Sequence, residues 1–490
     1  MWFADQPESG YPALAGDLDV DVVVVGGGIT GLTTALLLKR DGARVAVVEA
    51  RGVGSGVTGC TTAKVSALQQ TMYGTLRHHH GSDAAAIYGE ASLAAVETVA
   101  ALVDEEQISC DLQRRPAFTY AASAEERATV EREYSAARAA GLPVELVDQV
   151  DLPYQSFSAV RLEDQLQLHP VRYTQGLARA VDGHGSLVLE DTRAIEVNAG
   201  SPCRVRTTRG TITAGHVVDA AHYPFLDRGL FFARLEPMRS YCIAARVHGA
   251  IPAGMSISAG SPTRSVRSYG ELLILGGEGH ATGGQEATPA RYRRLEDFAR
   301  EHWDVATITN RWSAQDSISW DHLPVIGRYH PGSSPLFVAS GFHKWGLTTG
   351  TFAARIISDL IADRPNPWST QFNPTRVGAR GIPKITQLGS KFSLDFVADR
   401  LHAGLPRTAA DIAPGGGAAV RDGLGQTGVY RDPSGMLHGV SLRCTHLGCL
   451  LRFNSAERSW DCPCHGSRFD VDGNVLEGPA TKPLEHKPCP

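Results

Sequence analysis

Cysteine and histidine side chains, which can bind metals, are concentrated at the C-terminal end of the chain. Five of the nine cysteines lie between residues 444 and 490. Four of them, with two histidines, form two strings separated by 12 residues: Cys444-Thr-His446-Leu-Gly-Cys449 and Cys462-Pro-Cys464-His465-Gly-Ser467. A Cys-x-His pair and a Cys-x-x-His pair, each on a tight turn, can bind one metal centre from two sides.

Two kinds of metal centre fit these side chains. Two thiolates and two imidazoles are the ligand set of a Rieske [2Fe–2S] cluster, in which histidines replace two cysteines on one iron. They also suit a tetrahedral zinc ion in a zinc ribbon, although zinc motifs favour cysteine pairs two to four residues apart. Residues 450–460, between the strings, predict a hairpin with its turn near Asn454 and Ser455.

A second candidate site lies near the N-terminus, where a valine-rich segment runs into a glycine-rich turn. Gly26 permits the tight turn, Gly28 lets the backbone approach a pyrophosphate, and Gly31 lets a helix pack closely on a strand. The helix N-terminus offers free N–H groups to the phosphates, and Glu49 can accept hydrogen bonds from ribose hydroxyls. The strand, helix and second strand are expected at residues 19–25, 32–40 and 44–48. This pattern predicts a dinucleotide site without distinguishing FAD from NAD.

Three later segments favour FAD. Residues 54–64 form a loop of small residues that can pass close to a flavin ring. Residues 211–221 predict a strand, a turn and a returning strand that re-enters the same sheet. Asp321-His-Leu-Pro-Val-Ile-Gly327 precedes a strand at 336–339, the glycine-rich segment 341–350 and a helix at 352–363.

Residues 20–361 resemble the glycine/D-amino-acid oxidase (DAO) group of FAD-dependent oxidoreductases. The resemblance rests on the N-terminal fingerprint, the Asp-x-x-Pro-x-Ile-Gly segment and the late glycine-rich turn. It implies FAD bound at both ends of the domain, with a second NAD(P)H site unexpected because no other strand-linked GxGxxG occurs. The implied FAD-binding residues are Gly26, Gly28, Ile29, Thr30, Gly31, Glu49, Ala50, Arg51, Thr61, Thr62, Ala63, Ile195, Ala220, Gly341, Lys344, Trp345, Gly346, Leu347 and Thr348.

The C-terminal strings resemble Rieske proteins of the cytochrome bc/b6f type. The resemblance implies that Cys444, His446, Cys462 and His465 bind the cluster, while Cys449 and Cys464 form a disulfide that clamps the two loops. Ser467 matches a position whose hydroxyl bonds to a bridging sulfide. Phe469 stands where high-potential members have tyrosine, so a middling reduction potential is expected because hydrogen bonds to sulfur raise it.

From end to end the chain resembles a fusion of these two families. The expected fold is α/β (α+β): a two-lobed FAD-binding domain with a Rossmann-type βαβ unit, followed by a small all-β Rieske domain. Expected bounds are 1–370 for the first domain, 371–407 for a linker with one helix at 394–401, and 408–490 for the Rieske domain. Within the first domain, FAD segments are expected at about 18–75, 160–225 and 315–365, and the substrate lobe at about 76–160 and 226–314.

Two cofactors of different electron capacity suggest the function. Reduced flavin holds two electrons and a Rieske centre takes one, so we expect oxidation of a C–N or similar bond, followed by single-electron steps to the cluster and an external acceptor. The reverse flow is equally compatible with the sequence, as an electron-transfer module or as a flavin monooxygenase or reductase supplied through the cluster. Besides a small-molecule substrate, the expected partner is a ferredoxin, a quinone or a reductase.

Five residues are candidates for the catalytic site, and each has a structural alternative. Lys344 and Lys64 could stabilise reduced flavin or polarise dioxygen, or could be ordinary lysines. His280 could be a base or a loop histidine. Arg239 could bind a substrate carboxylate or form a structural salt bridge, and Tyr241 could line the pocket or belong to the core.

Composition limits the remaining classes of function. The net charge of −5, from 47 basic and 52 acidic residues, is not that of a nucleic-acid-binding protein. Uninterrupted apolar runs are shorter than the roughly 20 residues that cross a bilayer, so no membrane span is expected. With no export signal at the N-terminus, we expect a cytoplasmic protein. The run His78-His79-His80 could be a metal site, but a solvated helix end is the favoured interpretation.

Overall fold

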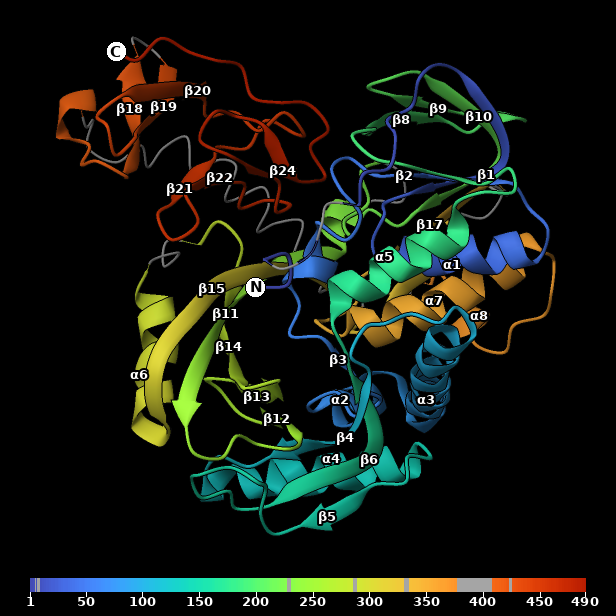
Figure 1. Ribbon diagram of the computed structural model, residues 1–490, viewed down its shortest axis with the longest axis vertical. Coiled ribbons are helices and arrows are strands. Elements are labelled where there is room, and N and C mark those ends of the chain that lie inside the picture. The colour runs from blue at the N-terminus through green and yellow to red at the C-terminus, as the bar shows by residue number, and fades with distance from the viewer. Residues whose placement is uncertain are drawn as a thin grey trace.

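The computed structural model describes residues 1–4, 6, 9–226, 231–284, 289–329, 335–376, 408–422 and 425–490. The helix expected at 394–401 lies outside the described residues. Within them the chain forms two large sheets and, at the C-terminal end, two small ones (Figure 1).

The first large sheet contains the predicted βαβ unit. Its strand order is β16-β17-β10-β1-β2-β7, with β9 beside β10 and β8 beside β9. Strand β1 is parallel to both β2 and β10, and four consecutive valines from Val22 to Val25 are buried in it. Val22 and Val24 pack with residues of helices, such as Leu32 and Phe352, whereas Val23 and Val25 pack on the other face with strand residues. The strand is apolar throughout because both of its faces are covered. The bounds are β1 (Leu18–Val25), β2 (Val45–Val48), β7 (Leu187–Leu189), β8 (Ala194–Asn198), β9 (Cys203–Thr207), β10 (Thr211–Asp219), β16 (Val325–Arg328) and β17 (Leu336–Ser340).

One expectation for this sheet is wrong. Residues 211–219 form the single strand β10, not a strand, a turn and a returning strand. A turn was expected at Gly215, but this residue lies within the strand. On one side β10 pairs with β1 along its length. On the other side its first half pairs with antiparallel β9 and its end pairs with parallel β17. Pairing on both sides outweighs the weak strand preference of one glycine.

The second large sheet, with strand order β15-β11-β14-β13-β12-β4-β6-β3, forms the other lobe, and β5 pairs with β6. Its longest strands, β11 and β15, run antiparallel at one edge. The bounds are β3 (Lys64–Val65), β4 (Gln113–Tyr120), β5 (Glu145–Val147), β6 (Ala159–Gln167), β11 (Leu235–His248), β12 (Met255–Ser258), β13 (Arg264–Tyr269), β14 (Leu272–Ala281) and β15 (Asp304–Ser319).

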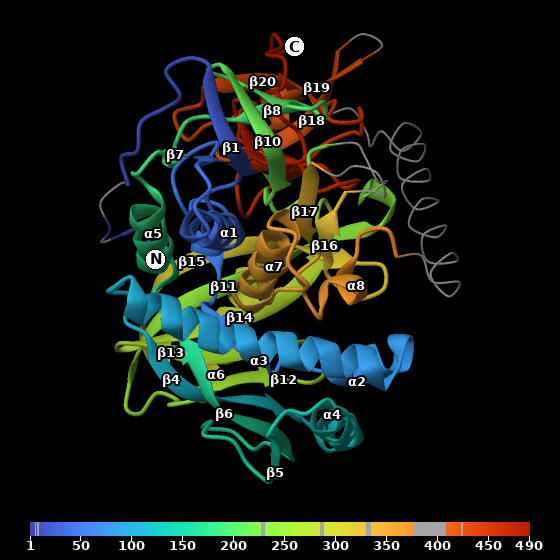
Figure 2. The ribbon, with the colours of Figure 1, turned by 90° about the vertical axis from the view of Figure 1, so that its right-hand side faces the viewer.

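Helices pack between and around the sheets. They are α1 (Ile29–Arg40), α2 (Met72–His80), α3 (Ser82–Glu105), α4 (Arg127–Ala139), α5 (Pro170–Val181), α6 (Ala290–His302), α7 (Gly346–Ile361) and α8 (Ser369–Phe372). Helices α1 and α7 begin earlier than predicted, because the glycine-rich turns lead directly into them. Helix α3 lies below α1 and α7 (Figure 2).

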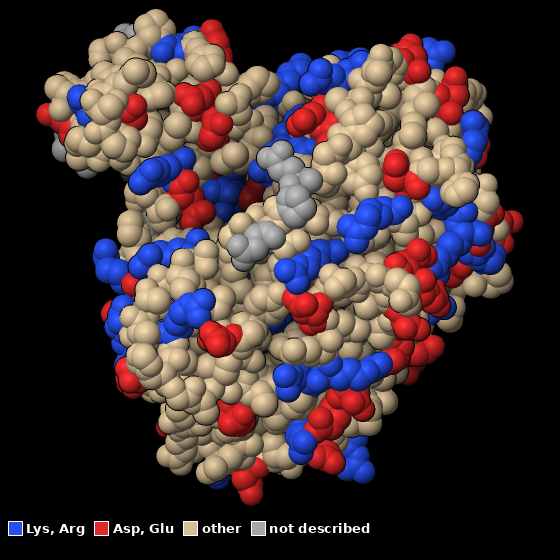
Figure 3. Space-filling view, in the orientation of Figure 1, with Lys and Arg blue, Asp and Glu red and all other residues tan. Residues whose placement is uncertain are grey.

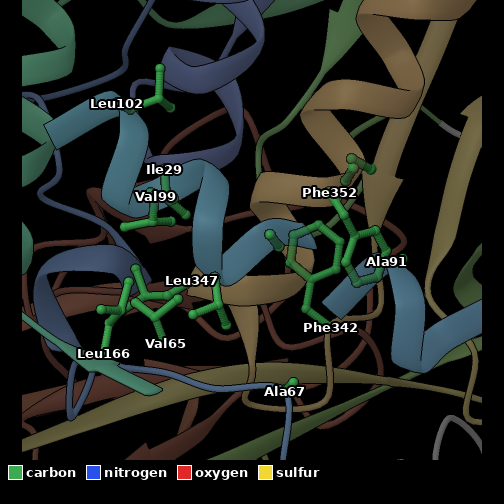
Figure 4. Packing of buried hydrophobic residues seen from close by; sticks show 14 of the residues in the cluster. Ile29, Val65, Ala67, Ala91, Val99, Leu102, Leu166, Phe342, Leu347 and Phe352 are labelled. Atoms are coloured by element: carbon green, nitrogen blue, oxygen red, sulfur yellow. The ribbon is translucent and has the colours of Figure 1, made fainter. Parts of the chain in front are cut away.

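Helix α3 is the one described helix long and apolar enough to cross a membrane. Its apolar residues instead belong to the main hydrophobic core, where Ala91, Val99 and Leu102 pack with Ile29 of α1 and Phe352 of α7 (Figure 4). It is therefore a core helix of this domain.

Among its described residues, the C-terminal domain contains strands, turns and one short 3-10 helix (Ala409–Asp411). One antiparallel sheet comprises β18 (Gly417–Asp422), β19 (Gly425–Arg431) and β20 (Leu437–Ser441). The other comprises β21 (Arg452–Asn454), β22 (Ser459–Asp461), β23 (Arg468–Phe469) and β24 (Val475–Glu477). Strands β21 and β22 form the predicted hairpin. The domain packs against the edge of the second large sheet that contains β11 and β15 (Figure 1).

Candidate functional site

A cavity of about 320 Å³ lies where the two large sheets and the C-terminal domain meet. Residues following β1, β2 and β10 line one part of it, and small residues of β11, β14 and β15 line another. Residues 476–481 of the C-terminal domain line a third part. From outside, a hollow with basic and acidic side chains at its rim separates the C-terminal domain from the rest of the molecule (Figure 3).

Two helix N-termini open into the cavity. Helix α1 begins at Ile29 after Gly28, and α7 begins at Gly346 after Trp345, and all four residues line the cavity. Neither helix has a side-chain cap or an acidic residue in its first turn. Because the N-terminal end of a helix is positively polarised, both ends favour electron-rich groups such as the phosphates of a dinucleotide.

The glycine-rich turn leaves no room for larger residues. A Cβ atom on Gly31 would lie 2.0 Å from the carbonyl oxygen of Gly26. Gly26 itself has φ +111°, and its Cβ would lie 2.6 Å from the carbonyl oxygen of Ala220. The turn therefore holds β1, α1 and β10 close together, which gives a dinucleotide access to the backbone.

Glu49 lies across this turn. One carboxylate oxygen accepts the Gly27 N–H at 2.8 Å, and the other accepts the Arg51 N–H at 3.0 Å. Glu49, Ala50 and Arg51 line the cavity. Ile195 does not, because its neighbours Arg193 and Ala194 take that place at the cavity wall.

The small-residue loop before β3 is fixed from three directions. The indole N–H of Trp2 donates to the Thr61 carbonyl at 2.8 Å, and that of Trp312 donates to the Cys60 carbonyl at 2.9 Å. The buried guanidinium of Arg267 donates to the carbonyls of Thr62 and Ala63 at 2.9 and 2.7 Å. Thr61 and Thr62 line the cavity, whereas Ala63 is buried behind it.

Three more predicted cofactor residues support the wall from behind. The cavity is not lined by three of the predicted FAD-binding residues, namely Gly31, Gly341 and Thr348. It is lined by four others from the same segments: Gly26, Ala220, Lys344 and Leu347. The Thr348 hydroxyl joins α7 to the loop after β3, because it accepts the Ser66 N–H at 2.9 Å. These residues therefore shape the cavity wall.

Strand alternation separates the candidate catalytic residues into two groups. Ser240 and Cys242 of β11 line the cavity, so Arg239 and Tyr241 point to the opposite face of the sheet. His280 lies on that opposite face too, stacked on Tyr241 with its Nε2 3.2 Å from the tyrosine hydroxyl. These three side chains do not line the cavity, and we do not retain them as substrate contacts.

Lys64 and Lys344 do line the cavity. The Lys64 ammonium donates to the Ser256 carbonyl at 2.8 Å and to the Ser265 hydroxyl at 2.7 Å. Burial, with Arg267 nearby, lowers the pKa of Lys64 to about 7. This amine can therefore gain or lose a proton near neutral pH.

Asp316 of β15 provides an opposite charge in the same part of the cavity. Burial raises the pKa of its carboxyl, although His222 and Lys344 act in the other direction. Besides the carboxylates of Glu49 and Glu477, the lining thus includes two amines, the carboxylate of Asp316 and the hydroxyls of Ser240 and Ser265.

The two cysteine-histidine strings form two loops of matching geometry. In the first loop the Cys444 N–H donates to the Cys449 carbonyl and the Gly448 N–H donates to the Cys444 carbonyl, both at 2.9 Å. In the second, the Cys462 N–H donates to the Ser467 carbonyl at 2.8 Å, and the Gly466 N–H donates to the Cys462 carbonyl at 3.1 Å. Each loop therefore presents one cysteine and one histidine to the same space.

The four side chains expected to bind a cluster meet between these loops. The rings of His446 and His465 lie 5.0 Å apart and nearly perpendicular. The thiols of Cys444 and Cys462 hydrogen-bond to each other, which lowers the pKa of Cys444. This donor set fits a [2Fe–2S] centre with two thiolate and two imidazole ligands.

Cys449 and Cys464 form a disulfide between the loops, with their Cα atoms 6.6 Å apart. Their sulfurs, with that of Cys462, also lie within 4.8 Å of one another, which is a possible metal-binding arrangement. The disulfide removes two of these three thiolates from metal binding, so the Cys444–His446–Cys462–His465 set is the one we retain.

The histidine run at the end of α2 meets two histidines distant in sequence. The ring of His79 lies 5.1 Å from that of His322, which in turn lies 5.2 Å from that of His343. His78 and His79 are exposed, as expected of a solvated helix end. Among the described residues, the potential metal-binding groups do not include these histidines.

The structure gives Arg239 the salt-bridge role that the sequence left open, but sequence reasoning missed that this residue and Gln315 join the two domains. Arg239 is buried and lies 3.6 Å from a carboxylate oxygen of Glu457 and of Glu477, both in the C-terminal domain. Gln315 donates to the Gly466 carbonyl at 2.9 Å. Alternation along β11 and β15 could have placed Arg239 and Gln315 on one face, but no pattern in the sequence shows which domain packs there.

The chain matches two protein families. Residues 21–360 match the FAD dependent oxidoreductase family, DAO, and residues 408–488 match the Rieske [2Fe-2S] domain. YhfW of Bacillus subtilis (strain 168), named as a Rieske 2Fe-2S iron-sulfur protein, is 35% identical over 491 residues, which cover 99% of this chain and 96% of YhfW. The cytochrome b6-f complex iron-sulfur subunit 1 of Nostoc sp. is 51% identical over 47 residues, 10% of this chain and 26% of that subunit.

Solved structures show the same fold for the first domain. Glycine oxidase from Geobacillus kaustophilus superposes with a TM-score of 0.63 at 20% identity, covering 74% of this chain and 100% of that one. L-proline dehydrogenase from P. horikoshii superposes with a TM-score of 0.59 at 19% identity, covering 74% and 98%. The predictions of the fold and of both cofactors are confirmed.

Proposed function

We infer the function from the family: the chain belongs to the DAO family of FAD-dependent oxidoreductases and carries a C-terminal Rieske [2Fe–2S] domain. We propose that it oxidises a C–N bond of a small amine or amino acid. The electrons are then exchanged one at a time, through the cluster, with an external redox partner. The observation that carries this proposal is the shared cavity. Residues 476–481 of the Rieske domain line the same cavity as the FAD-binding turns. Electron exchange between the two cofactors therefore requires no rearrangement of the domains.

When bound, FAD supplies an acceptor for the hydride of a substrate C–H bond. The residues on the sheet side of the cavity have the complementary tasks of binding and proton transfer. The ammonium of Lys344 and the carboxylate of Asp316 are a suitable pair for a substrate with one acidic and one basic group.

Lys64 has a different task. Oxidation of a C–N bond releases a proton, and the Lys64 Nζ can take it up because its pKa is about 7. The hydrogen bonds to Ser256 and Ser265 keep this amine at a fixed place in the cavity wall. Amino acids are also the substrates named for several proteins of the same fold, including glycine oxidase and L-proline dehydrogenase.

The test begins with holoprotein purified without oxygen, containing FAD and two irons per chain. Amino acids and amines are added one at a time while flavin absorbance and the electron paramagnetic resonance (EPR) signal of the cluster are recorded. We expect at least one of them to bleach the flavin and then to reduce the cluster. If none does, and only a reduced carrier protein reduces both cofactors, the chain is an electron-transfer module instead. We further propose a cytoplasmic location, since the cysteines of the described first domain form no disulfide, as is usual in a reducing compartment.

A further inference from the structure

The two cluster-binding loops have different surroundings. The second loop, Cys462–Ser467, is pressed against the FAD-binding domain. The Gln315 amide donates to the Gly466 carbonyl, and a Cβ atom on Gly283 would lie 2.6 Å from the Cα of Pro463. This loop is therefore an internal surface.

His465 belongs to this internal surface. It is fully buried, and its ring lies 6.4 Å from that of Tyr223. Tyr223 follows strand β10 and also lines the cavity. A single side chain thus spans the space between the flavin cavity and one histidine of the cluster site.

The first loop, Cys444–Cys449, faces outward. Thr445 and Leu447 are exposed and His446 is half-buried. Leu447, which is 37% exposed, is one of four large apolar side chains that are exposed among the described residues. An exposed apolar side chain thus lies directly beside one of the residues that would bind the cluster.

The charged residues of the two chain segments that form this outer loop and its neighbour are basic. Residues 433–456 and 478–484 contain no aspartate or glutamate. They contain Arg443 and Lys482, which are both exposed. The Thr445 hydroxyl donates to the Lys482 carbonyl at 2.6 Å, so the two segments lie together beside His446. The outer loop is therefore basic around an apolar centre.

We propose that the two histidines serve two different electron exchanges. His465 faces the flavin cavity through Tyr223. His446 and Leu447, with Arg443 and Lys482, form the docking site of an acidic one-electron carrier protein. The inference rests on the proposed function only in that the cluster exchanges electrons with the flavin. At the outer site one electron passes between the carrier and the Rieske centre; one is oxidised, the other is reduced, and no bond forms or breaks.

The outer site is tested with a reduced, acidic plant-type ferredoxin as the probe. Its reduction potential lies below the range of Rieske centres, so electron transfer from the ferredoxin to the cluster is favourable. The second-order rate of cluster reduction is measured by stopped flow in the holoprotein. We expect it to fall with rising ionic strength, because exposed charges attract the carrier.

Leu447→Glu is expected to lower this rate about tenfold or more, because it places a negative charge in the basic patch. The matched control is Met436→Glu. Met436 is 63% exposed in the hairpin between β19 and β20, and its replacement is expected to leave the rate unchanged. The cluster potential of Leu447→Glu, measured in parallel, separates a docking effect from a change in driving force.

Three results would overturn the outer site. One is a rate that depends neither on salt nor on Leu447, and another is a faster reaction with a basic c-type cytochrome. The third is a water-soluble quinone whose reaction with the cluster shows the same dependence on Leu447.

The inner contact is tested by light-driven reduction of the flavin with EDTA as donor, which needs no substrate. The rise of the cluster EPR signal is compared with flavin bleaching. Tyr223→Leu is expected to delay the cluster signal, Tyr223→Phe to restore it, and the ferredoxin rate to stay unchanged in both. Phe225→Leu is the control, since Phe225 lines the same cavity.

The inner contact would be overturned if, in the Tyr223→Leu variant with FAD bound, the cluster signal followed flavin bleaching as quickly as it does in the wild-type protein. If that variant does not retain FAD, Gln315→Ala replaces it, because it removes the hydrogen bond that holds the second loop to the first domain. Failure of every amine to bleach the flavin would sink the proposed substrate class and leave these measurements intact.

Discussion

At Lys64, burial determines the charge of an otherwise ordinary side chain. Lysine is charged at neutral pH in water, but here the ammonium loses its hydration and regains only two hydrogen bonds. Its pKa therefore falls to about 7. Lys64 is charged below that pH and neutral above it.

We expect the absorption spectrum of the bound flavin to titrate with an apparent pKa near 7, because the charge of Lys64 changes in the flavin cavity. The Lys64→Met variant removes the titrating amine and is expected to abolish this inflection. Lys487→Met is the control, since Lys487 pairs with Glu485 at the surface of the other domain. An unchanged inflection in Lys64→Met would assign the titration to another group.

The four loop cysteines are expected to have separate roles. Cys444→Ser and Cys462→Ser should lose both irons, because each removes a thiolate of the cluster. Cys449→Ser and Cys464→Ser should keep the irons and lose them faster on heating, because only the link between the loops is gone. Iron analysis and EPR decide the matter. The assignment would be contradicted if Cys449→Ser and Cys464→Ser lost iron as completely as Cys444→Ser and Cys462→Ser.

At the scale of elements, the βαβ unit depends on contact between backbones. Gly31→Ala would place a methyl group 2.0 Å from the Gly26 carbonyl oxygen. The turn cannot accommodate this group without moving α1 away from β1. The purified variant is therefore expected to contain no FAD, as measured by flavin absorbance per chain.

Gly16→Ala provides the control for this substitution. Gly16 lies just before β1, and a Cβ atom there meets no other atom within 4 Å. This variant should bind FAD fully. Normal FAD content in Gly31→Ala would show that the turn is more adaptable than the contact distances imply.

Strand β11 shows how register decides which residues can act. Arg239 and Tyr241 have side chains suited to binding a substrate, yet they alternate with Ser240 and Cys242, which line the cavity. A shift of one residue exchanges the two faces of a strand. Residue type alone therefore left both a substrate-binding and a structural role open for Arg239 and Tyr241, and the register of β11 favours the structural one.

At the scale of the whole molecule, buried ion pairs join the two domains. Burial alone would raise the pKa of Glu477, but Arg468 and Arg239 outweigh it and lower that pKa. A carboxylate with a lowered folded-state pKa stabilises the fold above its unfolded pKa, and this contribution is lost as the pH falls through the folded value. Domain contact is thus expected to weaken in acid below the ordinary glutamate pKa of 4.5.

Arg239→Met should destabilise this contact by about 1–3 kcal/mol, because it removes a buried guanidinium that lies 3.6 Å from the partly buried carboxylates of Glu457 and Glu477. Arg246→Met, on the same strand, removes a surface pair with Glu271 and should cost less than about 1 kcal/mol. Thermal unfolding followed by near-ultraviolet circular dichroism measures both. Equal midpoints for the two variants would show that the buried pairs do not hold the domains together.

Local patterns in the sequence determined the parts of the protein whose chemistry lies within short segments. The turn from Gly26 to Gly31, the acidic Glu49 and the two cysteine-histidine loops are such segments, and so both cofactors could be predicted. The tight turn and the ligand spacing impose their own backbone geometry, whatever the rest of the chain does.

Only the tertiary structure decided how these sites face each other. The wall formed by residues 476–481, the contact of Tyr223 with His465 and the burial of Arg239 join segments that are far apart in the chain. Such contacts depend on which faces of two domains are complementary, and one sequence does not encode that as a local pattern. The sequence predicts two redox centres; their placement on opposite sides of one shared cavity wall comes from the packing of the domains.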